Sequence, residues 1–188
     1  MQAAAIETVT SSEDRERLFA DLVANERDRA VALAYHLVGG DRELARDVAQ
    51  EAFVRAYRAL PGFRGEAQLS TWFLRIVINQ AASARRREKL RRLLGLGPRD
   101  GGDPEATHPD PAAGPDAAAH GQVVKRRIAL ALDGLSAGQR RAFALIHLEG
   151  LTVERAAVVL GRAPGTVKSH LHRALATLRR ELADLVEE

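Results

Sequence analysis

The chain contains no cysteine, few aromatic residues and no long apolar run. The absence of cysteine excludes a disulfide framework and a thiolate zinc site, and it suits a reducing cytoplasm. The sequence also lacks a secretory signal and the run of about eighteen apolar residues that a membrane-spanning helix requires. We therefore expect a cytoplasmic protein without membrane insertion.

Aromatic residues make up 4% of the 188 residues, and Phe143 is the only one in the second half of the chain. This length suffices for one ordinary domain or two small ones. Because the aromatic residues are so unevenly placed, we expect each half to build its own core, mainly from Leu, Val and Ala. We predict an all-α fold of two small helical domains, residues 1–94 and 122–188.

Residues 95–121 read as a disordered or extended linker between these domains. The segment holds five of the seven prolines and no large apolar residue after Leu96, so burial could not offset the entropy of ordering it. Fully extended it would reach about 90 Å, enough for the domains to contact DNA sites two helical turns, about 70 Å, apart. The linker carries a net charge of −4 between domains of +3 and +4, a distribution that favours a polyanion partner for both domains.

Helical periodicity and cap signals divide the first half into elements. Asp41 is a good N-cap, Pro61 and Gly62 stop the helix that follows it, and Ser70 is the expected N-cap of a long last helix. Apolar residues recur at helical spacing between these signals. The predicted helices lie near 13–24, 27–38, 41–60 and 70–92.

The second half is predicted to contain helices at about 122–133 and 136–148, followed by a helix-turn-helix over 148–178. Thr152 can cap the first helix of this motif, Gly161 can end it in the left-handed conformation, and Pro164 fits the first turn of the second helix. The second helix has a regular apolar face. That face consists of Val167, Leu171, Ala174, Leu175 and Leu178.

The opposite face of this second helix carries groups that can bind phosphates and base edges in a major groove. They are Thr166, Lys168, Ser169, His170, His172 and Arg173. An amphipathic hairpin with a basic solvated face is the alternative interpretation. A phosphate-binding loop does not fit, because three residues separate Gly161 from Gly165 and no strand precedes them. His170 and His172 point apart on a helix, so we predict no metal site there. We also predict no cofactor and no catalytic residue.

One polar patch lies on the helix predicted at 41–60. Asp47, Gln50 and Glu51 share one surface at spacings of three and four residues, where like charges repel slightly. Glu51 is also placed for an ion pair with Arg55, so a simple solvated face is one interpretation. A docking surface for a basic partner is the other.

A second polar group spans the loop before the long helix, the start of that helix and the arginine run at its end. Aromatic and amide groups beside cations can hold an unstacked base, and stacking is worth about 1–3 kcal/mol per base. Core packing is the alternative for Trp72 and Phe73. The candidate nucleic-acid residues are Phe63, Arg64, Gly65, Glu66, Trp72, Arg75, Asn79, Arg85, Arg86 and Arg87.

These motifs in this order resemble the extracytoplasmic-function (ECF) group of bacterial sigma factors. The resemblance rests on DVAQEAF, PGFRGEAQLSTWFLRIVINQA, the arginine run, the linker and LEGLTVERAAVVLGRAPGTVKSHLHRA, and it covers nearly all of the chain outside the linker. It implies an alternative sigma factor that binds core RNA polymerase and directs promoter-specific transcription initiation. Such a protein is not an enzyme.

The resemblance also implies roles for the candidate residues. Asp47, Gln50 and Glu51 would dock on the coiled coil of the largest polymerase subunit. The loop and long-helix residues would capture the melted minus-ten strand. The helix from Pro164 would read the minus-thirty-five element while its domain contacts the polymerase flap. An anti-sigma factor is expected as a further partner, from the family alone.

Three positions depart from the family pattern. Arg46 stands where an acid is frequent, His170 where arginine is frequent, and Arg155 where glutamate would complete a capping box with Thr152. A helix-turn-helix regulator of the response-regulator type, not acting as a polymerase subunit, is the alternative hypothesis. Its receiver domain would need alternating strands and helices, whereas residues 1–94 read as helical throughout.

Overall fold

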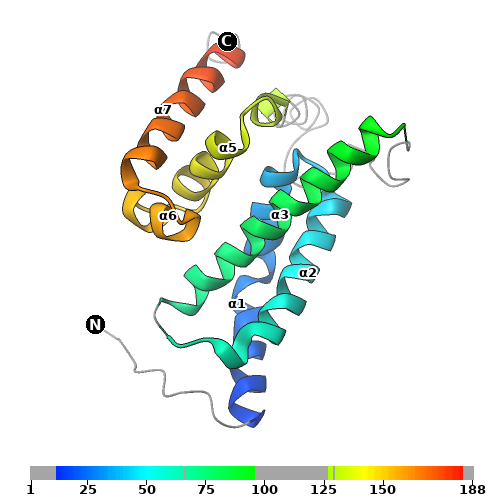
Figure 1. Ribbon diagram of the computed structural model, residues 1–188. Coiled ribbons are helices and arrows are strands. Elements are labelled where there is room, and N and C mark those ends of the chain that lie inside the picture. Colours follow the sequence, from blue (N-terminus) through cyan, green and yellow to red (C-terminus); the bar gives the residue numbers. More distant parts are fainter. Residues whose placement is uncertain (1–11, 66, 96–126, 129, 184–188) are drawn as a thin grey trace, which may run out of the picture.

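The computed structural model describes residues 12–65, 67–95, 127–128 and 130–183 (Figure 1). Every regular element in these ranges is helical, which confirms the all-α prediction. None of the described helices is both long and apolar enough to cross a membrane. The elements are α1 (Ser12–Val38), α2 (Arg42–Ala59), the 3-10 turn η1 (Leu60–Gly62), α3 (Leu69–Leu93), α5 (Ala137–Phe143), the π-helical turn η2 (Ala144–Leu148), α6 (Val153–Leu160) and α7 (Pro164–Glu181).

Helix α1 is continuous, so the predicted break between helices near 13–24 and 27–38 is wrong. No glycine or proline interrupts the sequence there, and a helix normally needs such a residue to end abruptly. The Asn25 side chain donates a hydrogen bond to the carbonyl of Asp21, 2.8 Å away. This bond runs back along the same helix and leaves the backbone ladder intact.

The caps of α2 and α3 give one confirmation and one correction. Asp41 accepts a hydrogen bond from the backbone of Leu44 at 2.8 Å, as its N-cap role predicts. The predicted N-cap Ser70 lies inside α3 instead. That helix begins one residue earlier, after Gln68, because Leu69 packs against the core and is already helical.

Helices α1, α2 and α3 run alongside one another as a bundle (Figure 1). Their facing stripes bury Leu33, Val48, Phe73 and Val77, each at most 3% exposed. Phe73 stacks on Phe53 with a centroid separation of 4.5 Å. Phe73 is therefore a core residue, as the packing interpretation of this position predicted.

The helix-turn-helix of the second half follows its sequence signals closely. Thr152 accepts a hydrogen bond from the backbone of Arg155, which begins α6. Gly161 ends that helix in the left-handed conformation, with φ of 60°. Pro164 occupies the first turn of α7, where its missing N–H costs nothing.

Helix α5 begins with a capping box in which Ser136 and Gln139 each satisfy the other's backbone N–H. The helix predicted at 136–148 is present, with its last turn in the wider π form. Residues 127–128 and 130–133 are helical as predicted. The rest of the predicted helix at 122–133, and the linker apart from Gly95, lie outside the described residues.

The two halves share one apolar core, so the expectation that each builds its own is wrong. Ala142, Leu145 and Val159 belong to the same buried cluster as Leu33 and Phe73. A smaller cluster lies within the second half. The shared core follows from size, because a half built mainly of aliphatic residues buries more apolar surface by packing on its neighbour.

Candidate nucleic-acid and polymerase interfaces

Helix α7 presents a polar face that its buried face holds in place. Val167, Ala174 and Leu178 are buried, and they fix the helix against the rest of the second half. The Ser169 hydroxyl donates to the carbonyl of Gly165 at 3.0 Å. Five of the six predicted minus-thirty-five residues are exposed, and His170 is half-buried. The exposed five are Thr166, Lys168, Ser169, His172 and Arg173.

The loop before α3 is only partly available to a ligand. Phe63 is buried, and its ring centroid lies 5.1 Å from that of the half-buried Trp72. The two rings pack against each other at the start of the helix. Arg64 and Gly65 are exposed, whereas Glu66 lies outside the described residues. Packing therefore accounts for Phe63, and the polar residues beside it face solvent.

Arg75 and Asn79 both lie on the exposed face of α3, one turn apart. Arg75 also reaches the second half, where its Nη2 donates to the carbonyl of Val158 at 2.5 Å. Arg85, ten residues further along the helix, pairs with Asp133 through a contact of 2.6 Å. Two candidate strand-binding residues of the first half thus touch the second half.

The other two arginines of the run are exposed on α3. Arg86 donates to the Ser83 hydroxyl at 2.9 Å, and Arg87 also faces solvent. An arginine cluster at the end of a helix supplies a positive surface that suits a phosphate backbone.

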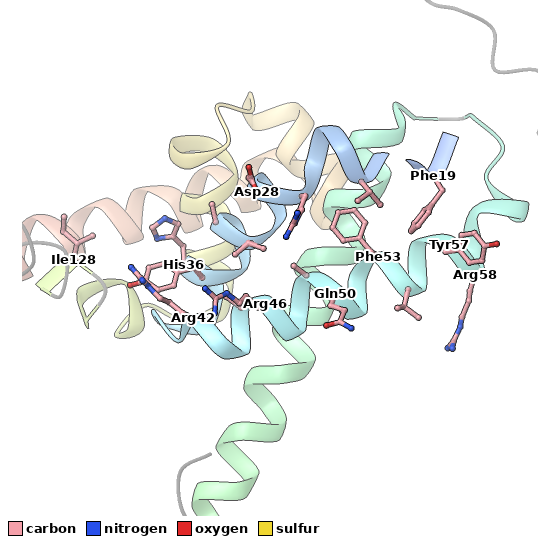
Figure 2. Close-up of a pocket in the computed structure, with 18 residues that line it drawn as sticks. Phe19, Asp28, His36, Arg42, Arg46, Gln50, Phe53, Tyr57, Arg58 and Ile128 are labelled. Carbon is pink, nitrogen blue, oxygen red and sulfur yellow. The ribbon is translucent and has the colours of Figure 1, made fainter. Parts of the chain in front are cut away.

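The acidic patch on α2 is exposed over Asp47, Gln50 and Glu51. Glu51 pairs with Arg55 at 3.3 Å, as the spacing predicted, and both side chains are about half exposed. An exposed pair of this kind contributes little to stability. Gln50 also lines a groove of about 1630 Å³ between α1 and α2 (Figure 2), which sequence patterns did not indicate.

The groove has an apolar floor and several arginines along it. Phe53 and Tyr57 line it from α2, and Arg46 reaches it from the same helix (Figure 2). Tyr57 is 45% exposed, which is unusual for a large ring that could pack inward. The groove and the acidic patch therefore meet at Gln50 and form one continuous surface on α2.

Sequence reasoning missed Arg140, a buried arginine at the junction of the two halves. Its guanidinium donates to the carbonyls of Leu132 at 2.7 Å and Leu135 at 2.9 Å. Burial and the nearby Arg85 charge lower its pKa to about 10, while Asp133 opposes the shift. Periodicity assigns charged residues to solvent by default, so no local signal identifies this one.

The described residues contain no group of three or more His, Asp or Glu side chains that could hold a metal ion. The described residues present a basic face on α7, a row of arginines on α3, and an acidic patch on α2 beside an apolar groove. Such features bind macromolecules through charge and shape complementarity.

Comparison with known proteins identifies two matching families and several similar chains. Residues 22–91 match the family described as Sigma-70 region 2, and residues 125–178 match Sigma-70, region 4. The chain is 33% identical over 182 residues to RNA polymerase sigma-H factor of Pseudomonas aeruginosa, covering 92% of this chain and 90% of the relative. It is 29% identical over 169 residues to ECF RNA polymerase sigma factor SigW of Bacillus subtilis, covering 89% and 90%.

A solved structure also resembles this fold. It is the sigma factor RpoE of Bartonella quintana in complex with the anti-sigma factor NepR, with a TM-score of 0.67 and 28% sequence identity. The match covers 89% of this chain and 98% of that chain.

Proposed function

The chain belongs to the ECF group of sigma factors and is an alternative sigma factor that directs transcription initiation, and we propose that its two halves divide the promoter between them. In this proposal residues 1–94 dock on polymerase and capture the melted minus-ten strand. Residues 122–188 read the minus-thirty-five element, and residues 95–121 connect the two. The observation that carries the proposal is the exposed polar face of α7, held by its buried apolar face.

The second half recognises the minus-thirty-five element through the first turns of α7. Lys168 and Ser169 lie early in this helix, where side chains enter a major groove most deeply. Arg173 lies more than one turn later and contacts phosphate. The helix-turn-helix signature at Thr152 and Gly161 supports this assignment.

The first half captures the melted strand along α3. Asn79 and Arg75 are exposed on one face, with Arg86 and Arg87 continuing a positive surface that tracks the backbone. Trp72 and Phe63 pack against each other at the start of the same helix. Captured bases offset the few kcal/mol needed to unstack each step, so no nucleotide hydrolysis is required of the protein.

The acidic patch of Asp47, Gln50 and Glu51 docks on the coiled coil of the largest polymerase subunit. Its exposure and its continuity with the apolar groove at Gln50 support this role. The second half contacts the polymerase flap. Because polymerase works in the cytoplasm, the proposal carries a cytoplasmic location, and the protein acts by binding without catalysis.

An anti-sigma factor is proposed as a further partner. The similar Bartonella quintana sigma factor was solved in complex with one. Such a partner would hold the protein away from polymerase until a signal releases it.

The experiment that tests strand capture is permanganate footprinting of promoter thymines by reconstituted holoenzyme. Asn79→Ala removes a donor from the exposed face of α3, so we expect reduced thymine reactivity in the minus-ten region. Thr166→Ala is the matched control, because it removes a polar group from the second half and should reduce promoter occupancy rather than melting per bound complex. Parental reactivity per bound complex in Asn79→Ala would contradict the assignment of α3 to the melted strand.

A further inference from the structure

The last turns of α3 extend beyond the bundle that the helix forms with α1 and α2. The last buried residue of this helix is Ala84, although the helix continues to its C-cap Leu94. The end of α3 projects past α1 and α2 (Figure 1, Figure 2). We term residues 86–94 the overhang. Because none of its side chains is buried in the core, the overhang needs another reason for its composition.

The exposed residues of the overhang are of two kinds only. They are four cations and three leucines, namely Arg86, Arg87, Lys89 and Arg92, and Leu90, Leu93 and Leu94. The one acid between residues 86 and 94 is Glu88. Its side chain is 17% exposed and pairs with Arg92 at 3.2 Å. The overhang therefore presents positive charge and apolar surface to its surroundings, with little negative charge between them.

The three leucines form one apolar face. Leu90, Leu93 and Leu94 stand at spacings of three and four residues, which place side chains on the same side of a helix. They are 57%, 74% and 64% exposed, respectively. A single exposed leucine is ordinary on a protein surface, but an apolar patch rimmed by charged residues is typical of an interaction site. We term these three residues the leucine face.

Cations border the leucine face on both sides. Successive residues of a helix are rotated by about 100°, so Lys89 lies about 40° from Leu93, and Arg87 lies about 20° beyond Leu94 at the other edge. Arg86 precedes the face on the same side of the helix. Helices with an apolar face and bordering cations lie at bilayer surfaces, where the apolar side chains enter the acyl boundary and the long cationic side chains reach the headgroups.

The composition of the overhang favours an anionic bilayer over two other partners. A nucleic acid would neutralise the cations but would leave the leucine face without an apolar contact. A second copy of the chain would cover the leucine face but would bring two sets of like charges together. The surface of an anionic bilayer satisfies both, because it offers phosphates for the cations and an acyl boundary for the leucines.

We propose that the overhang of α3 is a peripheral binding site for the surface of an anionic lipid bilayer. The leucine face enters the acyl boundary, and the four exposed cations bind lipid phosphates. The helix end lies on the surface and does not cross it. The site does not depend on the proposed function, although both use Arg86 and Arg87. A chain bound to a bilayer through these arginines cannot at the same time present them to a melted strand.

Vesicle binding by the full chain tests the charge requirement of the site. We expect the chain to sediment with vesicles made of equal parts of phosphatidylglycerol and phosphatidylcholine, and to partition at least about tenfold more weakly into vesicles of phosphatidylcholine alone. Added salt should weaken the binding, because it screens the cations from the headgroups. Lys89→Gln should weaken it as well.

Variants of the leucine face test the apolar requirement. Leu93→Gln combined with Leu94→Gln leaves the charge unchanged and should lower partitioning into the anionic vesicles about tenfold, because two apolar side chains no longer leave water. Leu148→Gln combined with Val158→Gln is the matched control. It removes two exposed apolar side chains from the second half and should leave partitioning unchanged.

A dye locates the part of the chain that enters the bilayer. The chain has no cysteine, so an environment-sensitive dye can be attached at Leu90→Cys on the leucine face or at Ala176→Cys, an exposed position on α7. Anionic vesicles should shift the emission of the first dye to the blue and leave that of the second unchanged. This comparison separates insertion of the overhang from adsorption through the basic face of α7.

Binding of a labelled random-sequence single-stranded oligonucleotide separates lipid from nucleic acid. Leu93→Gln combined with Leu94→Gln should leave this affinity within about twofold of the parent, since phosphate neutralisation depends on the cations. An equal loss of oligonucleotide and vesicle binding would instead assign the leucine face to nucleic acid. The proposed function is tested separately by Asn79→Ala, which lies outside the overhang, so the two ideas can fail independently.

Three further results would overturn the proposal. They are equal partitioning into neutral and anionic vesicles, parental partitioning of the leucine double variant, and an emission shift at Ala176→Cys without one at Leu90→Cys. If circular dichroism shows that the double variant does not fold, Leu90→Gln alone takes its place. Parental vesicle binding with weakened association to core polymerase would assign the leucine face to a protein partner and reject the bilayer.

Discussion

The imidazole of His170 on α7 lies directly against Gly138 on α5. A Cβ atom at position 138 would lie 2.7 Å from the Cε1 atom of the ring, closer than packed atoms allow. The ring therefore sets how closely α7 approaches α5. This packing explains why His170 is half-buried while its neighbours Ser169 and His172 are exposed.

Gly138→Ala should destabilise the protein by about 1 kcal/mol, since the added methyl overpacks the contact with His170. In a His170→Ala background the same change should instead stabilise by up to about 1 kcal/mol, because alanine is the better helix former. Urea unfolding of the parent, of each single variant and of the double variant gives the coupling energy between positions 138 and 170. An equal effect of Gly138→Ala in both backgrounds would show that the two residues do not act on each other.

The acidic patch of α2 gives a second prediction. Asp47→Ala combined with Glu51→Ala should leave the helix folded, since alanine favours helix, and should weaken association with core polymerase about tenfold, in line with loss of a charged contact. Association should also become less sensitive to salt. Glu13→Ala with Glu16→Ala, which removes two exposed acids from α1, is the control. Equal affinities for both double variants would favour a merely solvated face.

The proposed role of α7 in reading DNA gives a third prediction, which separates phosphate contacts from base contacts. Lys168→Ala should cost about 1–3 kcal/mol at one base pair and relax preference there, while Arg173→Ala should weaken binding evenly across sequences. Binding of single-base promoter variants at fixed salt measures both effects. The opposite pattern would reverse the two roles, and no effect of either change would remove α7 as the reader.

A fourth prediction concerns His36, whose burial lowers its pKa below the ordinary 6.5 although the Glu149 charge opposes the shift. The folded state thus binds this proton more weakly than the unfolded chain. Its contribution to stability is complete above pH 6.5 and decreases as the pH falls below that value. His36→Gln should make stability less dependent on pH between 7.5 and about 5.5, as urea unfolding would measure. An identical pH dependence in parent and variant would contradict the assignment.

Short sequence motifs correctly predicted the helix caps and turns that depend on only a few neighbouring residues. The cap at Asp41 and the turn from Gly161 to Pro164 require specific residues at specific backbone angles, so the sequence indicates them directly. The cap at Ser70 was predicted wrongly because burial of Leu69, a tertiary contact, sets the start of α3. Each local preference is small enough for packing to override it.

The contacts between the halves could not be predicted from the sequence. Arg29 and Glu149 are 120 residues apart, and neither stands in a motif that marks it as paired. Arg140 lies among residues that periodicity assigns to solvent, yet it is 3% exposed. Such pairs depend on how whole helices pack, and single-sequence patterns do not contain that information.

The most direct test of the division of the promoter maps both halves on DNA in one complex. A cleavage reagent is attached at Ser83→Cys on α3 or at Ala176→Cys on α7, and holoenzyme is assembled on a promoter that it selects. We predict cleavage near the minus-ten element from α3 and near the minus-thirty-five element from α7, about two helical turns apart. Cleavage of the same base pairs from both positions would contradict the account.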